Sequence, residues 1–243
     1  MKILGVIPAR LKSTRLPEKM LLRINNRPLV AYTYFNALKS RLDDVIIAVD
    51  HPRMVRELSA FKCRVMLTSS RHRSGTDRVA EVTRSVKADF YVNIQGDEPL
   101  VHPAMLNKIV DHVNKNPHVQ IVTLGRKITD GKMVRDPAVV KIVMNNKKEA
   151  LYFSRSVIPF NRDNTPDTEY IKHFGIYCFQ ARVLKELTRL KQTNLEKTEK
   201  LEQLRFLQNG YRIDVVLTEH DTISVDTPAD FRRVKRILEG IMN

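Results

Sequence analysis

A loop rich in cations follows the first apolar segment of the chain, and its residue types are suited to binding phosphate. Residues 8–19 read PARLKSTRLPEK and contain four cations and two hydroxyls. Arginine pairs with phosphate oxygens in a bidentate manner, and lysine adds a point charge. Such a loop can hold a triphosphate and neutralise charge that develops on a pyrophosphate leaving group. A solvated basic loop is the alternative, but the position directly behind a strand favours a binding role.

Two aspartates form a second candidate group. Asp97 lies in QGDEP at 95–99 and Asp226 in VDTP at 225–228, each behind an apolar segment. If these two segments converge, their carboxylates can hold Mg²⁺, which takes one or two carboxylates and completes its shell with substrate phosphates and water. The alternatives are a turn for Asp97 and a helix cap for Asp226 or Thr227. Gly96 favours the binding role of Asp97, because a glycine lets backbone and ligand approach closely.

Further polar groups occur as short segments. SGTDR at 74–78 opens a predicted helix and can present backbone amides to a ligand, although alone it is an ordinary helix cap. YFSR at 152–155, HFGIY at 173–177 and the stretch from 195 to 205 carry arginine, histidine, glutamate and glutamine. These side chains can hydrogen-bond a hydroxylated acid, but each segment also suits a surface helix or strand.

The elements that must position these groups alternate along the chain. Apolar runs predict strands at 2–7, 45–49, 62–67, 90–94, 119–124 and 213–217, with the first strand stopped by Pro8. Helical spacing predicts helices at 27–42, 53–59, 77–86, 103–114, 184–190, 195–207 and 228–242. Between 126 and 180, shorter strand-like pieces separated by prolines indicate a small mixed section. We therefore predict a single domain over 1–243, an α/β open sheet of Rossmann-like build, with ligands at the carboxyl ends of the strands.

Composition excludes several classes of protein. With 42% hydrophobic and 28% charged residues, the chain is globular, and it has no apolar run long enough for membrane insertion. Cys63 and Cys178 stand far apart without a CxxC motif, so we expect reduced thiols and a cytoplasmic location. The sequence has neither GxGxxG nor a complete P-loop, which disfavours dinucleotide oxidoreductases and P-loop enzymes.

The charge balance points to an anionic partner. Lys and Arg number 42 against 27 Asp and Glu, a net charge of +15. Such an excess favours phosphates or nucleic acid. Because the cations are spread along the chain and only 7% of residues are aromatic, no nucleic acid is expected as a partner.

Seven segments in order resemble the 3-deoxy-manno-octulosonate cytidylyltransferases, or CMP-Kdo synthetases, over essentially the whole chain. They are IPARLKSTRLPEKML at 7–21, SGTDRVAE at 74–81, QGDEP at 95–99, ALYFSR at 150–155, HFGIY at 173–177, LEKTEKLEQLR at 195–205 and VDTPAD at 225–230. The resemblance implies the nucleotide-diphospho-sugar transferase fold, with a mixed insertion at about 130–180 used for dimerisation. It also implies that CTP and the acidic eight-carbon sugar Kdo (3-deoxy-D-manno-octulosonate) react with Mg²⁺ to give CMP-Kdo and pyrophosphate for lipopolysaccharide biosynthesis.

The resemblance also assigns roles to individual residues. The implied catalytic residues are Arg10, Lys19 and Asp97. The implied nucleotide-binding residues are Ala9, Arg10, Ser13, Arg15, Lys19, Ser74, Gly75 and Gln95. The implied sugar-binding residues are Arg78, Gln95, Arg155, His173, Tyr177, Glu202 and Gln203. Asp97 and Asp226 would bind the metal, and Asp97 could alternatively accept the proton of the sugar hydroxyl.

Three residues depart from the family pattern, namely Asp77, Phe160 and Cys178, and they leave open a variant sugar such as the 8-amino form of Kdo. A nucleotidyltransferase that acts on another sugar is an alternative within enzymes. A non-catalytic basic nucleic-acid-binding protein is the alternative from another class. The intact Arg10, Lys19, Asp97 and Asp226 argue against that last hypothesis.

Overall fold

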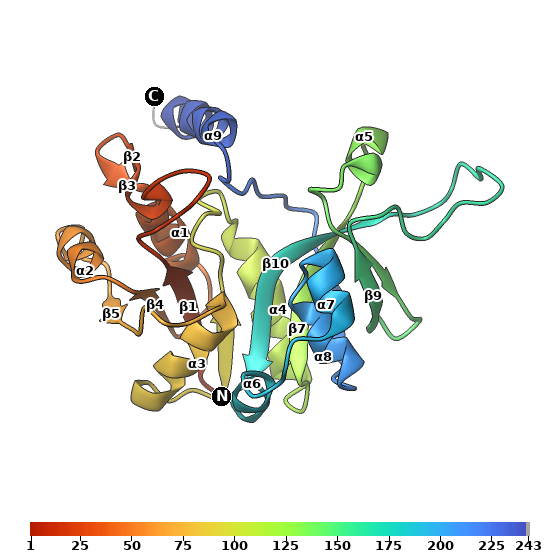
Figure 1. Ribbon diagram of the computed structural model, residues 1–243, viewed down its shortest axis with the longest axis horizontal. Coiled ribbons are helices and arrows are strands. Elements are labelled where there is room, and N and C mark those ends of the chain that lie inside the picture. Colours follow the sequence, from red (N-terminus) through yellow and green to blue (C-terminus); the bar gives the residue numbers. More distant parts are fainter. Residues whose placement is uncertain (242–243) are drawn as a thin grey trace.

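A mostly parallel sheet forms the centre of the computed structural model, which describes residues 1–241 (Figure 1). Its main path runs in the order β11-β7-β10-β6-β1-β4-β5. These strands are β1 (Ile3–Ala9), β4 (Asp44–Val49), β5 (Val65–Leu67), β6 (Phe90–Asn93), β7 (Ile121–Lys127), β10 (Ile171–Gln180) and β11 (Ile213–Leu217). All neighbours on this path are parallel except that β10 runs antiparallel to both β6 and β7. The predicted α/β open sheet of Rossmann-like build is confirmed.

Helices cover both faces of this sheet, and for this reason β1 and residues 45–49 of β4 are apolar without interruption. In β1, Ile3 and Ile7 belong to one core cluster, whereas Leu4 and Val6 belong to the other. The helices α1 (Leu29–Leu38), α2 (Pro52–Ser59) and α4 (Pro103–Lys115) contribute to the first cluster. The helices α3 (Gly75–Ser85), α6 (Ala181–Leu187) and α8 (Gln203–Gln208) contribute to the second. Because helices occupy both faces of the sheet, a binding site is expected at the ends of the strands, where polar residues lie.

The first strand runs through Pro8, so the prediction that this proline stops it was wrong. Strand β6 pairs with β1 only as far as Val6, whereas β4 pairs with it up to Ala9. Beyond Val6 the strand therefore has one neighbour, which is a position where a sheet tolerates proline. The strand therefore ends at Ala9 and not at Ile7 as predicted, and Arg10 is the first residue after it.

Two predicted helices have different bounds. Helix α1 begins at Leu29, because Arg27–Pro28 forms β3 and pairs with β2 (Arg23–Ile24). The predicted helix at 195–207 is two helices, α7 (Asn194–Glu199) and α8, because Lys200 takes a left-handed conformation with φ 56°. The other predicted strands and helices are present, most of them with shifted ends. The closing helix α9 covers Pro228–Ile241, and its predicted end at Met242 lies outside the described residues.

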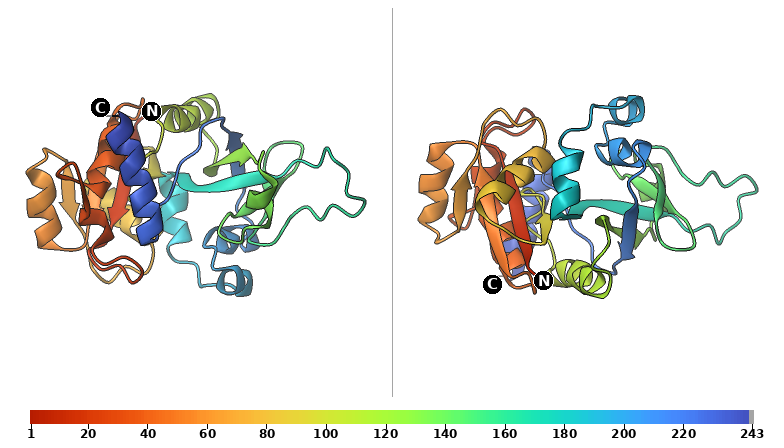
Figure 2. Two further views of the ribbon diagram at one scale, coloured as in Figure 1. Left: turned by 90° about the horizontal axis from the view of Figure 1, so that it is seen from above. Right: turned by 90° about the horizontal axis from the view of Figure 1, so that it is seen from below.

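The section from 130 to 180 contains both a peripheral hairpin and a central strand. Strands β8 (Lys141–Met144) and β9 (Ala150–Ser154) pair antiparallel, and β8 also pairs antiparallel with the start of β10. The short helix α5 (Gly131–Arg135) precedes them. Between β9 and β10 the chain forms an arm, residues 155–170, that projects from the body in each view (Figures 1 and 2). Phe160 on this arm is 83% exposed.

Within residues 1–241, no helix combines the length and the hydrophobicity that a membrane-spanning segment needs.

Candidate active site

Asp97 and Asp226 meet beside the carboxyl end of β6, which was the condition for the proposed metal site. Only Asp97 follows a strand, however, because Asp226 lies in the loop between β11 and α9. The backbone N–H of Val225 donates a hydrogen bond of 2.9 Å to the carbonyl of Asp97, which brings the two segments together. The cap of α9 is made by Thr227 and Asp230, whose side chains and backbone N–H groups bond reciprocally. The side chain of Asp226 is therefore not needed as a cap and is free to face Asp97.

The basic loop brings two of its cations to these carboxylates. Lys19 opens the short 3₁₀ helix η1 (Lys19–Leu21), and its Nζ lies 2.6 Å from Asp97 Oδ2 and 3.0 Å from Asp226 Oδ1. Arg15 Nη2 lies 2.9 Å from the same Asp226 oxygen. Burial acts to lower the pKa of Lys19, but the two carboxylates outweigh it and the pKa is raised. A charge-balanced cluster thus stands where the sequence predicted phosphate and metal binding.

The carboxylate pair fits a hard cation. Both carboxylates have an oxygen within 3.0 Å of one Nζ, so they converge on a single point, and oxygen ligands are those that Mg²⁺ prefers. In the described part of the chain, no group of three His, Cys, Asp or Glu side chains could hold a metal ion. Mg²⁺ ordinarily completes its shell with substrate phosphate oxygens and water.

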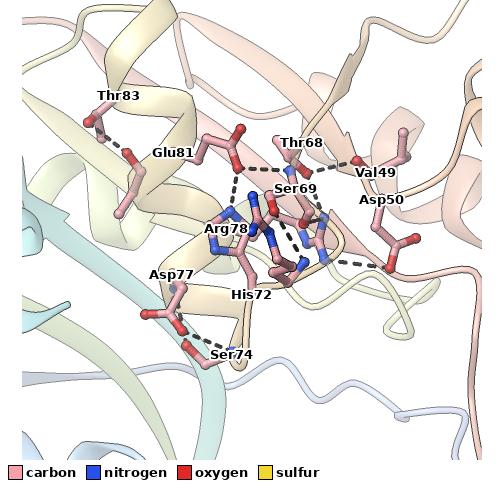
Figure 3. Close-up of polar contacts among 12 residues, drawn as sticks. Val49, Asp50, Thr68, Ser69, His72, Ser74, Asp77, Arg78, Glu81 and Thr83 are labelled. Carbon is pink, nitrogen blue, oxygen red and sulfur yellow. Dashed lines mark hydrogen bonds and ion pairs between the residues drawn. The ribbon is translucent and has the colours of Figure 1, made fainter. Parts of the chain in front are cut away.

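The start of the basic loop is anchored by Asp50, which follows β4. Its Oδ1 accepts a hydrogen bond of 2.9 Å from the backbone N–H of Leu11, and its Oδ2 lies 3.6 Å from Arg78 Nη2. Arg78 is completely buried and donates to Thr68 Oγ1 at 2.6 Å and to the carbonyl of Ser69 at 3.2 Å (Figure 3). Burial lowers the pKa of Arg78, and Asp50 opposes this effect. Arg78 thus contacts Asp50, Thr68 and Ser69, none of which is among the residues with which the resemblance grouped it.

The predicted polar turn at 74–78 is a complete helix cap. Ser74 Oγ accepts from the backbone N–H of Asp77 at 3.1 Å, and the carboxylate of Asp77 accepts from the N–H of Ser74 (Figure 3). The preceding loop is fixed by Glu81, whose Oε2 accepts from the N–H of Ser69 and contacts His72 Nε2. These contacts give the loop between β5 and α3 a defined path toward the strand ends.

Gly75 brings this turn close to the exit of β1. A Cβ at this position would lie 3.2 Å from Pro8 Cγ and 3.6 Å from Asn93 Nδ2. The closer of these distances is tighter than an ordinary contact, so a larger residue would push the turn away from the strand. The turn at Ser74 and Gly75 therefore lies beside Ala9, another predicted nucleotide-binding residue, and Arg10 and Ser13 follow on the half-buried loop.

Glu202 joins the nucleotide side to the start of α8. Its Oε2 accepts a hydrogen bond of 2.6 Å from the hydroxyl of Thr76, and its Oε1 accepts one of 2.8 Å from Arg205 Nη2. Burial raises the pKa of Glu202, while the bonds to the hydroxyls of Thr76 and Ser74 oppose the rise. The next residue, Gln203, is also buried. Thr76 was not among the predicted site residues.

Strand β10 contributes a second polar cluster. The hydroxyl of Tyr177 lies 2.8 Å from His173 Nε2, and Thr123 Oγ1 lies 3.2 Å from the same nitrogen. Burial lowers the pKa of His173 to about 3 and, helped by the charge of Glu202, raises that of Tyr177 well above its ordinary value. Gln95 donates to the carbonyl of Gly175 at 2.8 Å, which places it beside this cluster. The cluster is thus neutral and rich in groups that can bond a hydroxylated ligand.

Known proteins resemble this chain over its full length. Residues 4–213 match the cytidylyltransferase family model. A 3-deoxy-manno-octulosonate cytidylyltransferase of Solibacter usitatus is 46% identical, with 100% of this chain and 98% of that protein covered. One from Chloroherpeton thalassium is 44% identical, with 98% of each chain covered. The chain belongs to the 3-deoxy-manno-octulosonate cytidylyltransferase family.

A solved structure agrees with this family assignment. CMP:2-keto-3-deoxy-manno-octonic acid synthetase in complex with CTP is 37% identical and superposes with a TM-score of 0.94 over 99% of each chain. The predicted family and the predicted class, a nucleotidyltransferase, are both confirmed. The roles of single residues stay predictions.

Arg155 is the second predicted sugar-binding residue that the structure places in a different setting. Its Nε donates to the carbonyl of Glu199 at 2.9 Å and its Nη1 to the carbonyl of Pro137 at 2.9 Å. These bonds tie β9 to the end of α7 and to the loop before β8. In this conformation the guanidinium holds protein backbone, so a role in sugar binding would require it to exchange these partners.

Sequence reasoning missed the residues that hold others in place. Asp50 stood at a predicted strand exit, which was a usable signal, but its bond to the amide of Leu11 depends on the path of the loop. Thr76 lies within the SGTDR segment that the sequence singled out, but its bond to Glu202 depends on a distant part of the chain. Thr123 is a single hydroxyl within a strand, and nothing in the local sequence marks it.

Proposed function

We propose that the chain transfers the cytidylyl group of CTP to Kdo, giving CMP-Kdo and pyrophosphate in lipopolysaccharide biosynthesis. The anomeric hydroxyl oxygen of the sugar attacks the α-phosphorus, and the bond from that phosphorus to the bridging oxygen breaks. Pyrophosphate leaves, and the hydroxyl proton passes to a base or to water. The names of the full-length relatives support this reaction. The observation that carries it is the joining of Lys19, Arg15, Asp97 and Asp226 at the strand ends.

Catalysis in this proposal rests on positioning and charge neutralisation, as in other phosphoryl transfers. Arg10, Ser13, Arg15 and Lys19 bind the triphosphate, and Lys19 and Arg10 neutralise charge on the departing pyrophosphate. Ala9, Ser74 and Gly75 line the cytosine and ribose, since the Gly75 turn lies against the exit of β1. Gln95, at the end of β6, lies between nucleotide and sugar.

Asp97 and Asp226 would hold Mg²⁺, with the remaining ligands from phosphate oxygens and water. When bound, the ion supplies charge neutralisation at the phosphates and lowers the pKa of the attacking hydroxyl. The convergence of the two carboxylates on one point supports this role. Asp97 as acceptor of the hydroxyl proton is the alternative use of the same carboxylate.

The sugar is proposed to bind against β10 and the start of α8. His173, Tyr177, Glu202 and Gln203 offer hydrogen-bonding groups to its hydroxyls. Arg155 instead supports the surrounding backbone, because its guanidinium group bonds two protein carbonyls. Arg78 supports the loop at Thr68 and Ser69 through Nη1, while its buried Nε and Nη2 have no hydrogen-bond partner within residues 1–241. A variant acid sugar, such as 8-amino-3,8-dideoxy-manno-octulosonate, is the alternative substrate. We further propose a cytoplasmic homodimer that uses the arm at residues 155–170.

Pyrophosphate release tests the function directly. Purified protein and Mg²⁺ would be combined with CTP, UTP, ATP or GTP, each with Kdo, its 8-amino analogue or N-acetylneuraminate. We expect release with CTP and Kdo, and release with CTP and the 8-amino analogue alone would identify the variant substrate. No release with any pair would overturn the proposal, and salt-sensitive RNA or DNA binding in its place would favour the nucleic-acid-binding alternative.

A further inference from the structure

Lys19 occupies the point on which the two aspartates converge. Its Nζ is within hydrogen-bond distance of one oxygen from each carboxylate, at 2.6 and 3.0 Å, and its side chain is only 9% exposed. Arg15 lies on the outer side of the pair and is 68% exposed. Two negative and two positive side chains are therefore already paired before any ligand arrives.

A divalent cation cannot bind both carboxylates while the ammonium group of Lys19 stays between them. An ion that bound both carboxylate oxygens would stand next to the ammonium group, and two cations at such separation repel strongly where water is largely excluded. The ion can bind only if Lys19 withdraws. Withdrawal without a new anionic partner would leave a half-buried ammonium group unpaired, which is itself unfavourable.

A triphosphate supplies the missing partner. Lys19 ends in a flexible four-carbon stem and Arg15 is mostly exposed, so both can turn toward phosphate oxygens while remaining on the same loop. The carboxylates freed by this exchange can then accept the cation. Binding of nucleotide and cation is thus coupled through two side chains of the protein.

We propose that Lys19 and Arg15 are the resident counter-ions of Asp97 and Asp226 in the substrate-free protein, and that their transfer to the triphosphate admits the divalent cation only together with the nucleotide. This inference rests on the proposed function for the identity of the nucleotide. In the substrate-free protein, the carboxylate pair therefore has low affinity for a free divalent cation, because Lys19 competes with the cation for the carboxylates.

Mn²⁺ titration followed by electron paramagnetic resonance, without nucleotide or sugar, tests this consequence. Lys19→Met removes the ammonium group, so we expect it to bind Mn²⁺ at least about tenfold more tightly than the wild type. Arg15→Met should give a smaller gain, because its guanidinium is exposed and screened. Lys12→Met is the matched control, since it removes the same charge from an exposed position of the same loop and should leave Mn²⁺ affinity unchanged.

The double variant Lys19→Met with Asp97→Asn locates the bound ion, and we expect it to lose the gain. Equal or weaker Mn²⁺ binding by Lys19→Met, or a gain that survives in the double variant, would overturn the proposal. If Lys19→Met is unstable, Arg15→Met carries the same test. Circular dichroism verifies the fold of each variant.

The coupling itself is measured from the affinity for CTP with and without Mn²⁺. We expect Mn²⁺ to raise CTP affinity less in Lys19→Met than in the wild type, because the carboxylates of the variant are already free. An equal effect in both proteins would contradict the exchange. Because wild-type pyrophosphate release is assayed separately, its absence would count against the proposed function alone.

Discussion

The hydroxyl of Thr76 donates a hydrogen bond of 2.6 Å to Glu202 Oε2, although the two residues are 126 positions apart. Thr76 belongs to the first turn of α3, which begins at the proposed nucleotide turn, whereas Glu202 immediately precedes α8. The bond therefore links the two proposed halves of the site. Glu202 is held from the other side by Arg205, so its carboxylate has a defined orientation.

Replacing Thr76 tests whether this bond orients Glu202 for the sugar. Thr76→Val keeps the shape of the side chain but removes the donor, and a hydrogen bond to a charged group contributes about 1.5–3 kcal/mol. We expect the KM for the sugar to rise roughly tenfold with little change in the KM for CTP. Thr76→Ser should restore the wild-type value. Equal rises in both KM values would indicate a general loss of structure.

Arg78 separates the role implied by the resemblance from the role that its contacts favour. Arg78→Lys keeps a charge but loses the paired bonds to Thr68 and Ser69, and with them support for Asp50 and the basic loop. We expect the KM for CTP to rise on the order of tenfold and that for the sugar to change little. Steady-state kinetics with either substrate varied measures both, and the exposed Arg84→Lys on the same helix is the control. A rise confined to the sugar would restore the original assignment.

Asp97→Asn tests the proposed metal role. The amide cannot carry the negative charge that the cation requires, so we expect turnover to fall by at least about 100-fold and its Mg²⁺ dependence to weaken. Pyrophosphate release at several Mg²⁺ concentrations and a circular dichroism spectrum are the measurements. Asp43→Asn, at an exposed position before β4, serves as the control. Activity near the wild-type level in Asp97→Asn would remove the residue from the metal site.

The stability of the protein should depend on pH through His173. Burial lowers the pKa of His173 to about 3, whereas in the unfolded chain it is about 6.5. Between these values the unfolded state binds a proton that the folded state does not, so the free energy of unfolding decreases as pH falls. Relative to His173→Gln, we expect the wild type to lose about 2 kcal/mol more between pH 6.5 and 4.5. Urea denaturation at both pH values measures this difference, and parallel losses in the two proteins would contradict it.

The exposed Phe160 provides a test of the proposed homodimer. Phe160 is 83% exposed on the projecting arm, where the proposed dimer would cover it. We expect the mass from light scattering at micromolar concentration to be that of a dimer, and Phe160→Asp to shift it toward the monomer. A monomeric wild type would exclude the dimer.

The local sequence pattern predicted which segments form strands and helices better than it predicted where each strand lies in the sheet. The apolar run that became β11 was predicted with its observed bounds, and the alternation of strands and helices predicted the open sheet. The central position of β10 was not predicted, because antiparallel pairing with β6 and β7 depends on contacts between distant segments. The break at Lys200 was missed for a related reason, since a helical pattern continues on both sides of one left-handed residue.

For the site, too, the sequence predicted individual residues better than the contacts between distant segments. The rule that ligands bind at the carboxyl ends of strands correctly placed Asp97, which follows β6, at the site. That Asp226 meets it was only a condition of the metal hypothesis, because Asp226 lies in the loop between β11 and α9 and not at the end of a strand. The rule could not predict that Lys19 would stand between the two aspartates, because this depends on where the basic loop returns. The same limit applies to Arg78, since its burial and its bonds to Thr68 and Ser69 arise from packing that no motif encodes.

The hydrogen bond from Val225 to the carbonyl of Asp97 has a consequence for synthesis of the chain on the ribosome. The chain is synthesised from its N-terminus, so the basic loop, Asp50 and Asp97 all emerge before Asp226. The carboxylate pair can therefore form only after the segment with Val225 and Asp226 has also been synthesised. A chain truncated before Val225 would therefore present the phosphate-binding cations without their second counter-ion. Such a fragment should bind anions indiscriminately and perform no chemistry.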